Sequence, residues 1–337
     1  MADPKPNSVT QFVTAIAVGA HVTAAAFLGR IPVLALGDGG VLLARQGGVQ
    51  RLEAHPGAAI LNAACDGNRL VTGGDDGRVM ETHGDGESRE IAYEKGRWID
   101  AVALRADGPI AWAAGKTVRA RDAAGAVKTH EAASGVRGLD FAAKGYRLAL
   151  AHYNGVSLWF PNAAAVPELL PWKGAHMDVT LSPDGRFAVS SMQENALHGW
   201  RLADRKDMRM TGYPAKTRSM AWSFDGNWLA TSGADACIVW PFQGKDGPMG
   251  KKPRECAVRP ARVSRVAFHP KMLIVALGYE DGWVMLCRLT DASEILVRLR
   301  QDSDSKGAIS ALAWSGDGTR LLFGTVDGEA GVLDLPQ

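Results

Sequence analysis

Three histidines and five aspartates are the side chains whose types and spacing could do chemistry. His21, His55 and His176 each precede an apolar run, and aspartates recur between later runs, at Asp38, Asp76, Asp235, Asp281 and Asp327. Imidazole and carboxylate groups gathered on one face could form a metal-binding or acid–base rim. Each of these aspartates except Asp235 is followed by glycine. The Asp-Gly pair suits tight hairpins because both residues accept positive φ. The spacing therefore favours turn chemistry over catalysis.

Motifs that would identify an enzyme or a metal site are missing from the sequence. It has no GxSxG elbow, no HExxH and no phosphate-cradling glycine loop. Its cysteines lie far apart without a CxxC pair, at Cys65, Cys237, Cys256 and Cys287. We therefore expect reduced thiols, no zinc site and no cofactor.

One region is strongly basic. Residues 200–265 contain 13 Lys and Arg against 6 Asp and Glu, although the whole chain has a net charge of only +2. The densest part is a long basic loop predicted over 244–256, with Lys245, Lys251, Lys252 and Arg254. Its Gly, Pro and Lys content suits a mobile exposed connection, either simply solvated or steering an acidic partner. Nucleic acid is disfavoured, because no stacking aromatics are interleaved in the loop.

The elements that must position these residues are short strands. The 337-residue chain is 46% hydrophobic with 39 glycines, a composition typical of a globular protein with many tight turns. A turn recurs as SPDG at 182–185, SFDG at 223–226 and SGDG at 315–318, followed each time by a second apolar run. The repeat measures about 42 residues, which fits four-stranded propeller blades and leaves no room for helices. The fold class is therefore all-β.

At this point the sequence resembles the WD40-repeat family over essentially the whole chain. The resemblance rests on Gly-Ala-His at 19–21 and 174–176, on the PDG-type turns, and on tryptophans that close third strands, Trp159, Trp200 and Trp240. In the family, a His, a Ser or Thr, a turn Asp and a Trp form a buried hydrogen-bonded chain. The resemblance thus implies a structural role for the histidines and turn aspartates named above.

No repeat keeps all four residues of that chain. The fifth unit comes closest, with His176, Ser190 or Ser191, Asn195 in place of Asp, and Trp200. The second has His55, Thr72 and Asp76 without the Trp, and the sixth has Ser232, Asp235 and Trp240 with Lys216 where His belongs. The chain is therefore expected to be a divergent bacterial-type member.

The repeats predict one domain over 1–337, a closed β-propeller of eight four-stranded blades, with seven blades as the alternative. Eight third strands end near Ala44, Thr82, Asp122, Phe160, Leu202, Pro241, Leu289 and Leu335. No fourth strand follows the last, so we expect Ser8–Ala15 to supply it and close the ring, leaving no free edge. Residues 1–7 are expected to be flexible.

The resemblance implies a non-catalytic scaffold for protein–protein interaction, because propellers display loops from many blades on one face. Candidate partner-binding residues stand at first-strand entrances: Trp98 with Arg97, Met177, Arg218 and Arg262. A rim Trp beside Arg is typical of an interface hot spot, although a Trp packed between blades is an equal alternative. The partner is expected to be a protein. An acidic partner would suit the basic region.

Two other functions stay open at this stage. One is a lactonase-like propeller enzyme with a metal in the central channel. The other is an exported envelope propeller, because Phe12–Leu28 is apolar, although the residues before it carry no net positive charge. We expect a cytoplasmic monomer that does not contact a membrane.

Overall fold

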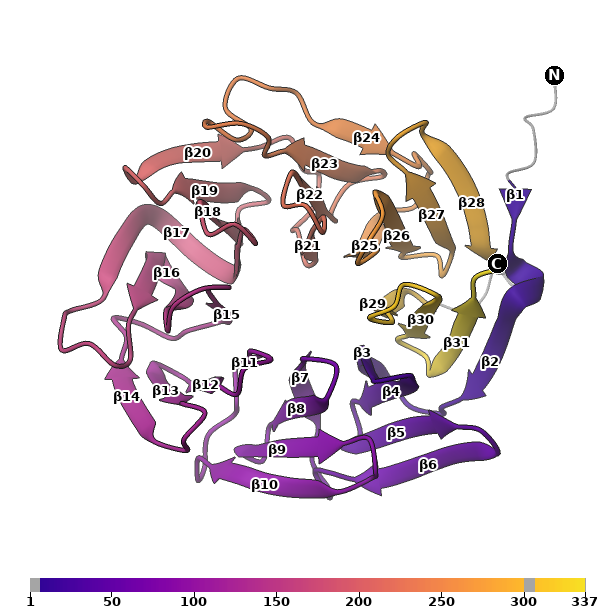
Figure 1. Cartoon of the computed structure of the whole chain (residues 1–337), viewed down its shortest axis with the longest axis horizontal. Helices are drawn as coiled ribbons and strands as arrows, with labels where there is room; N and C mark the ends of the chain where they lie inside the picture. Colours follow the sequence, from indigo (N-terminus) through magenta and orange to yellow (C-terminus); the bar gives the residue numbers. More distant parts are fainter. Residues whose placement is uncertain (1–6, 300–306, 337) are drawn as a thin grey trace.

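The chain forms a ring of antiparallel sheets. A computed structural model describes residues 7–299 and 307–336. Its elements are β1 to β31 and one short 3-10 helix, η1 (Thr10–Phe12). The sheets stand around a common centre, as in a propeller, with one edge strand of each sheet innermost (Figure 1). Within these ranges, no helix is long and apolar enough to cross a membrane.

The first half of the ring contains three four-stranded sheets and the beginning of a larger one. The first sheet has β3 (Val22–Leu28), β4 (Ile31–Leu36), β5 (Gly40–Arg45) and β6 (Gly48–Glu53). The second has β7 (Ile60–Cys65), β8 (Arg69–Gly74), β9 (Arg78–His83) and β10 (Ser88–Tyr93). The third has β11 (Ala101–Leu104), β12 (Ile110–Ala114), β13 (Thr117–Arg121) and β14 (Val127–Glu131).

The fourth sheet has six strands and contains two sequence units. Its strands are β15 (Gly138–Phe141), β16 (Leu148–Trp159), β17 (Glu168–Leu181), β18 (Phe187–Met192), β19 (Leu197–Arg201) and β20 (Lys206–Met210). The long strand β17 pairs with β16 through its first half and with β18 through its second half. It therefore runs without a break from the outside of unit four to the inside of unit five.

The remaining sheets complete the ring. One has β21 (Met220–Trp222), β22 (Trp228–Thr231), β23 (Cys237–Pro241) and β24 (Arg254–Cys256). The next has β25 (Val263–Phe268), β26 (Ile274–Tyr279), β27 (Val284–Arg288) and β28 (Ser293–Arg298), with β1 (Asn7–Ser8) on its edge. The last has β29 (Ile309–Trp314), β30 (Arg320–Thr325), β31 (Glu329–Asp334) and β2 (Val13–Ala17).

The expectation of eight separate four-stranded sheets is therefore wrong. The described residues form seven hydrogen-bonded sheets, of which five have four strands, one has five and one has six. The reason is the continuity of β16 and β17, 12 and 14 residues long, through which units four and five share a sheet. The number of sheets agrees with the alternative count of seven.

The recurring turns have one local structure. In SPDG, the Ser182 hydroxyl accepts a hydrogen bond from the Phe187 amide at 2.9 Å and donates one to Asp184 at 2.7 Å. The same bonds recur in the turns that begin at Ser223 and Ser315. The Asp-Gly turns need glycine for a second reason: at Gly39, with φ of 91°, a Cβ would lie 2.1 Å from the His55 carbonyl oxygen.

Side chains on the inner strands tie neighbouring sheets together. Thr23 on β3 donates to the Ile60 carbonyl of β7, Asn62 on β7 donates to the Ile99 carbonyl, and Ser310 on β29 donates to the Val22 carbonyl of β3. Apolar clusters fill the space between the sheets, each built from residues of adjacent ones. The ring is thus held by burial between sheets and by hydrogen bonds around its centre.

The N-terminal segment joins the two ends of the chain. β2 pairs antiparallel with β31, with Val13 opposite Leu333, and β1 pairs in parallel with β28 of the neighbouring sheet. The paired strand is Val13–Ala17 rather than Ser8–Ala15, because η1 interrupts the segment. The N-terminal chain thus spans two sheets (Figure 1). Of the N-terminal residues expected to be flexible, 1–6 lie outside the described ranges.

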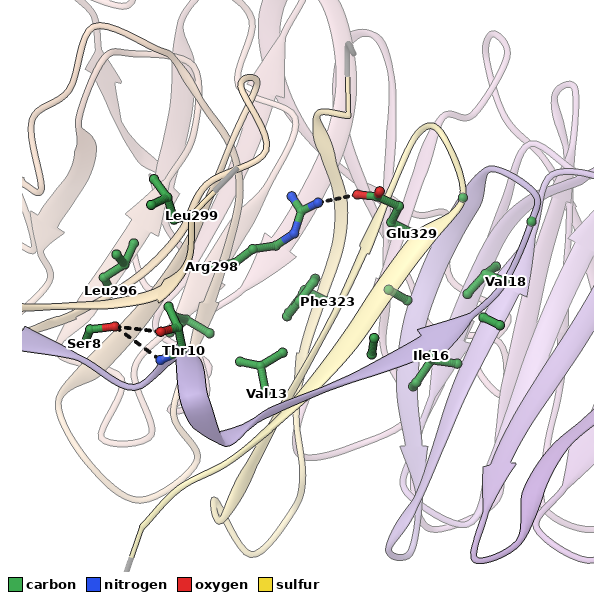
Figure 2. A pocket seen from close by; sticks show the side chains of 16 residues that line it. Ser8, Thr10, Val13, Ile16, Val18, Leu296, Arg298, Leu299, Phe323 and Glu329 are labelled. Carbon is green, nitrogen blue, oxygen red and sulfur yellow. Dashed lines mark hydrogen bonds and ion pairs between the residues drawn. The ribbon is translucent and has the colours of Figure 1, made fainter. Parts of the chain in front are cut away.

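A groove of about 810 Å³ lies beneath this segment, between β28 and β31. Figure 2 shows Val13 and Phe323 on its apolar side and an ion pair between Arg298 and Glu329 across it. Val9 and Val13 also pack against the core of the last two sheets. The groove therefore belongs to the joint that closes the ring.

Candidate functional site

His55 forms a buried structural network. Its Nε2 contacts the Thr72 hydroxyl at 2.9 Å and its Nδ1 contacts the Asp76 carboxylate at 3.1 Å. The imidazole is fully buried, and burial lowers its pKa. It has no free ring nitrogen for a metal ion or substrate.

His176 is also buried but has other partners. Its ring contacts the Ser190 hydroxyl at 2.7 Å and the Trp172 carbonyl oxygen at 3.0 Å. Asn195 instead donates to the Pro214 carbonyl. Trp200 is buried with its ring centre 5.8 Å from that of His176.

The sixth unit uses a tyrosine that the sequence analysis missed. The Trp240 indole donates to the Tyr213 hydroxyl at 2.7 Å, and that hydroxyl contacts Thr231 Oγ1 at 2.7 Å. Ser232 instead accepts hydrogen bonds from the backbone amides of Arg218 and Ser219. The signal that could have found this contact is Tyr213, three residues before Lys216, the position where the pattern places a histidine. The longer tyrosine side chain reaches the threonine from there.

The other predicted repeat residues have mixed surroundings. His21 is exposed, and its ring contacts the Val326 carbonyl oxygen at 3.2 Å. Asp235 is exposed, Trp159 is buried, and the other turn aspartates accept hydrogen bonds near their own turns, at Asp38, Asp281 and Asp327. The structural pattern therefore holds in some units only.

The candidate rim residues lie on one face of the ring. We define the entrance face as the face whose connections lead into the inner strands, and the opposite face as the one bearing the Ser-x-Asp-Gly turns. Trp98 is 63% exposed and Met177 is 39% exposed on the entrance face. Arg97, Arg218 and Arg262 are exposed there as well. Trp98 is therefore not packed between sheets.

Two hollows open at the centre of the entrance face. The central hollow, of about 490 Å³, is lined by residues that include Asp100, Arg137, Met177 and Asp178. The arginine hollow, of about 570 Å³, is lined by residues that include Arg262, Arg265, Glu280 and His21. Lys216 and Arg218 line both. The structure thus brings Met177, Arg218 and Arg262 together.

Trp98 and Arg97 stand apart from both hollows. Arg97 donates to the Ala114 carbonyl at 3.3 Å and to the Thr117 hydroxyl at 3.1 Å, both next to the β12–β13 turn. These bonds fix the connection that carries Trp98, so the indole stands exposed on a restrained segment.

Charge is distributed unevenly between the hollows. In the central hollow, the Arg137 guanidinium donates to Asp100 at 2.9 Å. In the arginine hollow, Arg262 pairs with Glu280 at 2.9 Å, whereas Arg265 donates to two carbonyl oxygens, those of Ser310 at 2.6 Å and Ser264 at 3.0 Å. Burial and the nearby charge of Arg218 lower the pKa of Arg265.

Two carboxyl groups on adjacent inner strands have raised pKa values. Loss of hydration between the inner strands raises the pKa of Asp140 to about 7 and that of Asp178 to about 6, and the charge of Asp178 adds to the effect on Asp140. Asp140 accepts a hydrogen bond from the Leu181 amide at 2.7 Å. Within the described ranges, no group of three or more His, Cys, Asp or Glu side chains could hold a metal ion.

The basic loop lies on the opposite face. It joins β23 to β24, and its last residues form β24 itself, so it connects two strands of one sheet. Arg186, from the SPDG turn, donates to the Gly244 carbonyl at 2.6 Å, and Lys251 donates to the Gln243 carbonyl at 2.6 Å. Gly247 is buried beside Phe187.

Some charged side chains in and beside this loop have partners within the protein. Arg201 forms ion pairs with Asp204 and with Asp246 of the loop. Arg254 lies over the Trp228 ring at 4.3 Å, and Lys245 lines a shallow hollow beside Arg186 and Arg201. Lys252 is exposed. The loop is held against the sheet at several points, and it cannot share a binding surface with Trp98.

Three cysteines that are distant in sequence meet between two sheets. Cys237 lies opposite Cys256 across β23 and β24, and both belong to one core cluster with Cys287 of β27. All four cysteines are free thiols. Burial raises the pKa of Cys237. The sequence spacing had given no sign of this packing.

Comparison with known proteins agrees with this geometry. A family model described as the anaphase-promoting complex subunit 4 WD40 domain matches residues 266–337, and one described as WD domain, G-beta repeat, matches residues 208–240. The chain thus contains WD40 repeats. No curated protein sequence matches it.

Solved structures share the fold of this WD40 protein at low sequence identity. The computationally designed Ika8 protein has a TM-score of 0.76 and 18% identity, covering 95% of this chain and 98% of that one. The C-terminal WD40 domain of Sif2 has a TM-score of 0.75 and 14% identity, covering 99% of this chain and 100% of that one. At such identity the likeness concerns the fold alone.

Proposed function

We propose that this WD40 protein is a non-catalytic scaffold that binds an acidic protein segment on its entrance face. WD40 propellers generally mediate protein–protein interactions. The observation that carries the proposal is the arginine hollow, whose described lining contains one carboxylate, Glu280, and four cations, Lys216, Arg218, Arg262 and Arg265. The exposed Trp98, on the same face, supplies an aromatic contact of the kind that dominates interface energy.

No specific observation favours the other candidate functions. WD40 families are generally non-catalytic, and the raised pKa values of Asp140 and Asp178 follow from loss of hydration between the inner strands. A cytoplasmic monomer remains part of this proposal.

Affinity capture tests the proposal. The full chain is immobilised, exposed to nuclease-treated native lysate at ~150 mM salt, where weak charge-driven contacts are largely screened, and the retained proteins are identified by mass spectrometry. We expect one reproducible partner that Arg218→Glu and Trp98→Ala each reduce at least about tenfold. Both residues are exposed, so the melting temperature should change little.

The basic loop provides a matched control. Lys251→Glu with Lys252→Glu makes a similar charge change on the opposite face and should leave capture unchanged. Loss of the partner in this control alone would overturn the proposed surface. If Trp98→Ala lowers the melting temperature strongly, its indole stabilises the fold and the hot-spot assignment is wrong.

A further inference from the structure

The arginine hollow contains a partly buried cation, Arg265, that has no carboxylate partner among the described residues. Among the described residues, Arg265 forms no ion pair, and its hydrogen bonds go to the neutral carbonyls of Ser264 and Ser310. Removing a guanidinium from water without a counter-charge costs free energy. An anion bound beside the guanidinium would offset this cost.

The surrounding charges add to this imbalance. Arg218 and Lys216 stand at the end of the connection before β21, and no described carboxylate lies within ion-pair distance of either. Arg218 is close enough to Arg265 to lower its pKa by repulsion. Arg262, directly before β25, is paired with Glu280. An anion in this hollow would reduce the repulsion as well as pair with Arg265.

A phosphate group fits this arrangement better than a carboxylate. Three cations without an ion pair among residues 7–299 and 307–336 converge on the hollow from two separate segments, so several donors would meet the anion from different directions. A phosphate monoester carries a charge of about −1.5 to −2 at pH 7 and three acceptor oxygens, and arginine forks match its geometry. A carboxylate carries one charge and two oxygens and would leave more of the positive charge unpaired.

We infer that the arginine hollow binds a phosphate group carried by the protein partner, held by Arg265 and Arg218 with Lys216. This inference rests on the proposed function, because it identifies the acidic segment as a phosphorylated one. The hollow, of about 570 Å³, has room for the group and its flanking residues. Trp98 would contact the partner outside it.

Inorganic phosphate tests the hollow itself. Phosphate is titrated into the purified full chain at pH 7.5 and constant ionic strength, with acetate as the comparison, and the melting temperature is followed. We expect a saturable rise with phosphate, because a ligand that binds only the folded state stabilises it. Arg218→Gln should weaken the apparent affinity about tenfold, and Lys251→Gln with Lys252→Gln should leave it unchanged.

Arg265→Met is the more direct variant, because it keeps the length of the side chain and removes the charge. It should abolish the phosphate response. If it fails to fold, the exposed Arg218→Gln decides the question. An equal rise with acetate, no rise with phosphate, or a full response in Arg218→Gln would each overturn the inference.

The source of the phosphate is tested in the capture experiment. Treatment of the lysate with phosphatase should reduce the retained partner about tenfold, and inorganic phosphate should elute it. Retention that survives phosphatase but is lost in Arg218→Glu would overturn the phosphate inference and leave the scaffold proposal standing. Retention that survives Arg218→Glu and Trp98→Ala alike would overturn the proposed surface.

Discussion

Individual side chains in this protein depart from the repeat pattern wherever packing offers an equivalent contact. Tyr213 takes part in the buried hydrogen bonds of the sixth unit, where the pattern places a histidine. His21 has the sequence position of a structural histidine but is exposed at the arginine hollow. A hydroxyl can replace an imidazole because both can donate and accept.

Asp140 gives a prediction at the residue scale. The pKa of the Asp140 carboxyl is about 7 in the folded protein, against 3.8 for an unperturbed aspartate. The folded protein therefore binds this proton more tightly than the unfolded chain does. The free energy of unfolding therefore falls as pH rises from about 4 to 7, and above pH 7 the loss is complete. Asp140→Asn should therefore stabilise the protein at pH 8 by about 1–2 kcal/mol, less than the full shift gives because the side chain is partly exposed.

Thermal melts at pH 4 and pH 8 check this prediction. The gain should vanish at pH 4, where the wild-type carboxyl is protonated in the folded protein. Asp235→Asn, at an exposed turn, is the matched control and should change the melt little at either pH. A gain of the same size at both pH values would show that charge is not its cause.

Strands and their connections explain why the ring closes. Ser310 on β29 donates to the Val22 carbonyl, which joins the last sheet to the first through the inner strands. β2 gives β31 its outer neighbour, and β1 extends to β28. Without β2, the backbone groups of β31 would form an open edge.

Removal of residues 1–18 tests the closing strand. We expect a melting temperature at least about 5 °C lower, or aggregation, because β31 loses its partner and the groove of Figure 2 loses one wall. Removal of residues 1–8 deletes β1 alone and is the control, with a smaller effect expected. Equal melts for the two truncated chains would show that β2 contributes nothing to closure.

The whole molecule separates its two basic regions. Arg218, Arg262 and Arg265 surround the arginine hollow on the entrance face, whereas Lys245, Lys251 and Lys252 lie on the opposite face. Both regions fall between residues 200 and 265 of the sequence. Antiparallel strands reverse direction at each turn, so successive connections alternate between the two faces.

A circular permutant tests closure at this scale. Gln337 is joined to Met1, and the chain is opened between Ala165 and Val166, in a connection where Val166 is 89% exposed. β2 pairs with β31, with Val13 opposite Leu333, so segments near the two ends of the sequence share one sheet. We expect a monomeric protein that melts within about 5 °C of the original, because a closed ring depends little on where the chain begins. A permutant that assembles only as an oligomer would contradict this.

The sequence by itself determined the strands, their turns and the propeller class. The Ser-x-Asp-Gly and Asp-Gly turns specify local backbone geometry, and these signals lie within a few residues, as the bonds of Ser182 show. The position of Trp98 before an inner strand and the pairing of an N-terminal strand with the last sheet also followed from the order of the repeats, whereas the sequence left the exposure of Trp98 open.

Only the tertiary structure decided which strands share a sheet and which side chains meet. β17 hydrogen-bonds to both β16 and β18. This pairing depends on which backbones lie close together in space, and the apolar pattern of the sequence does not encode that. Cys237, Cys256 and Cys287 come together only when sheets pack side by side. Packing likewise gives Arg265 a carbonyl partner, Ser310, and no carboxylate among the described residues. Contacts between distant segments depend on the path of the whole chain, so the candidate site could be assembled only in three dimensions.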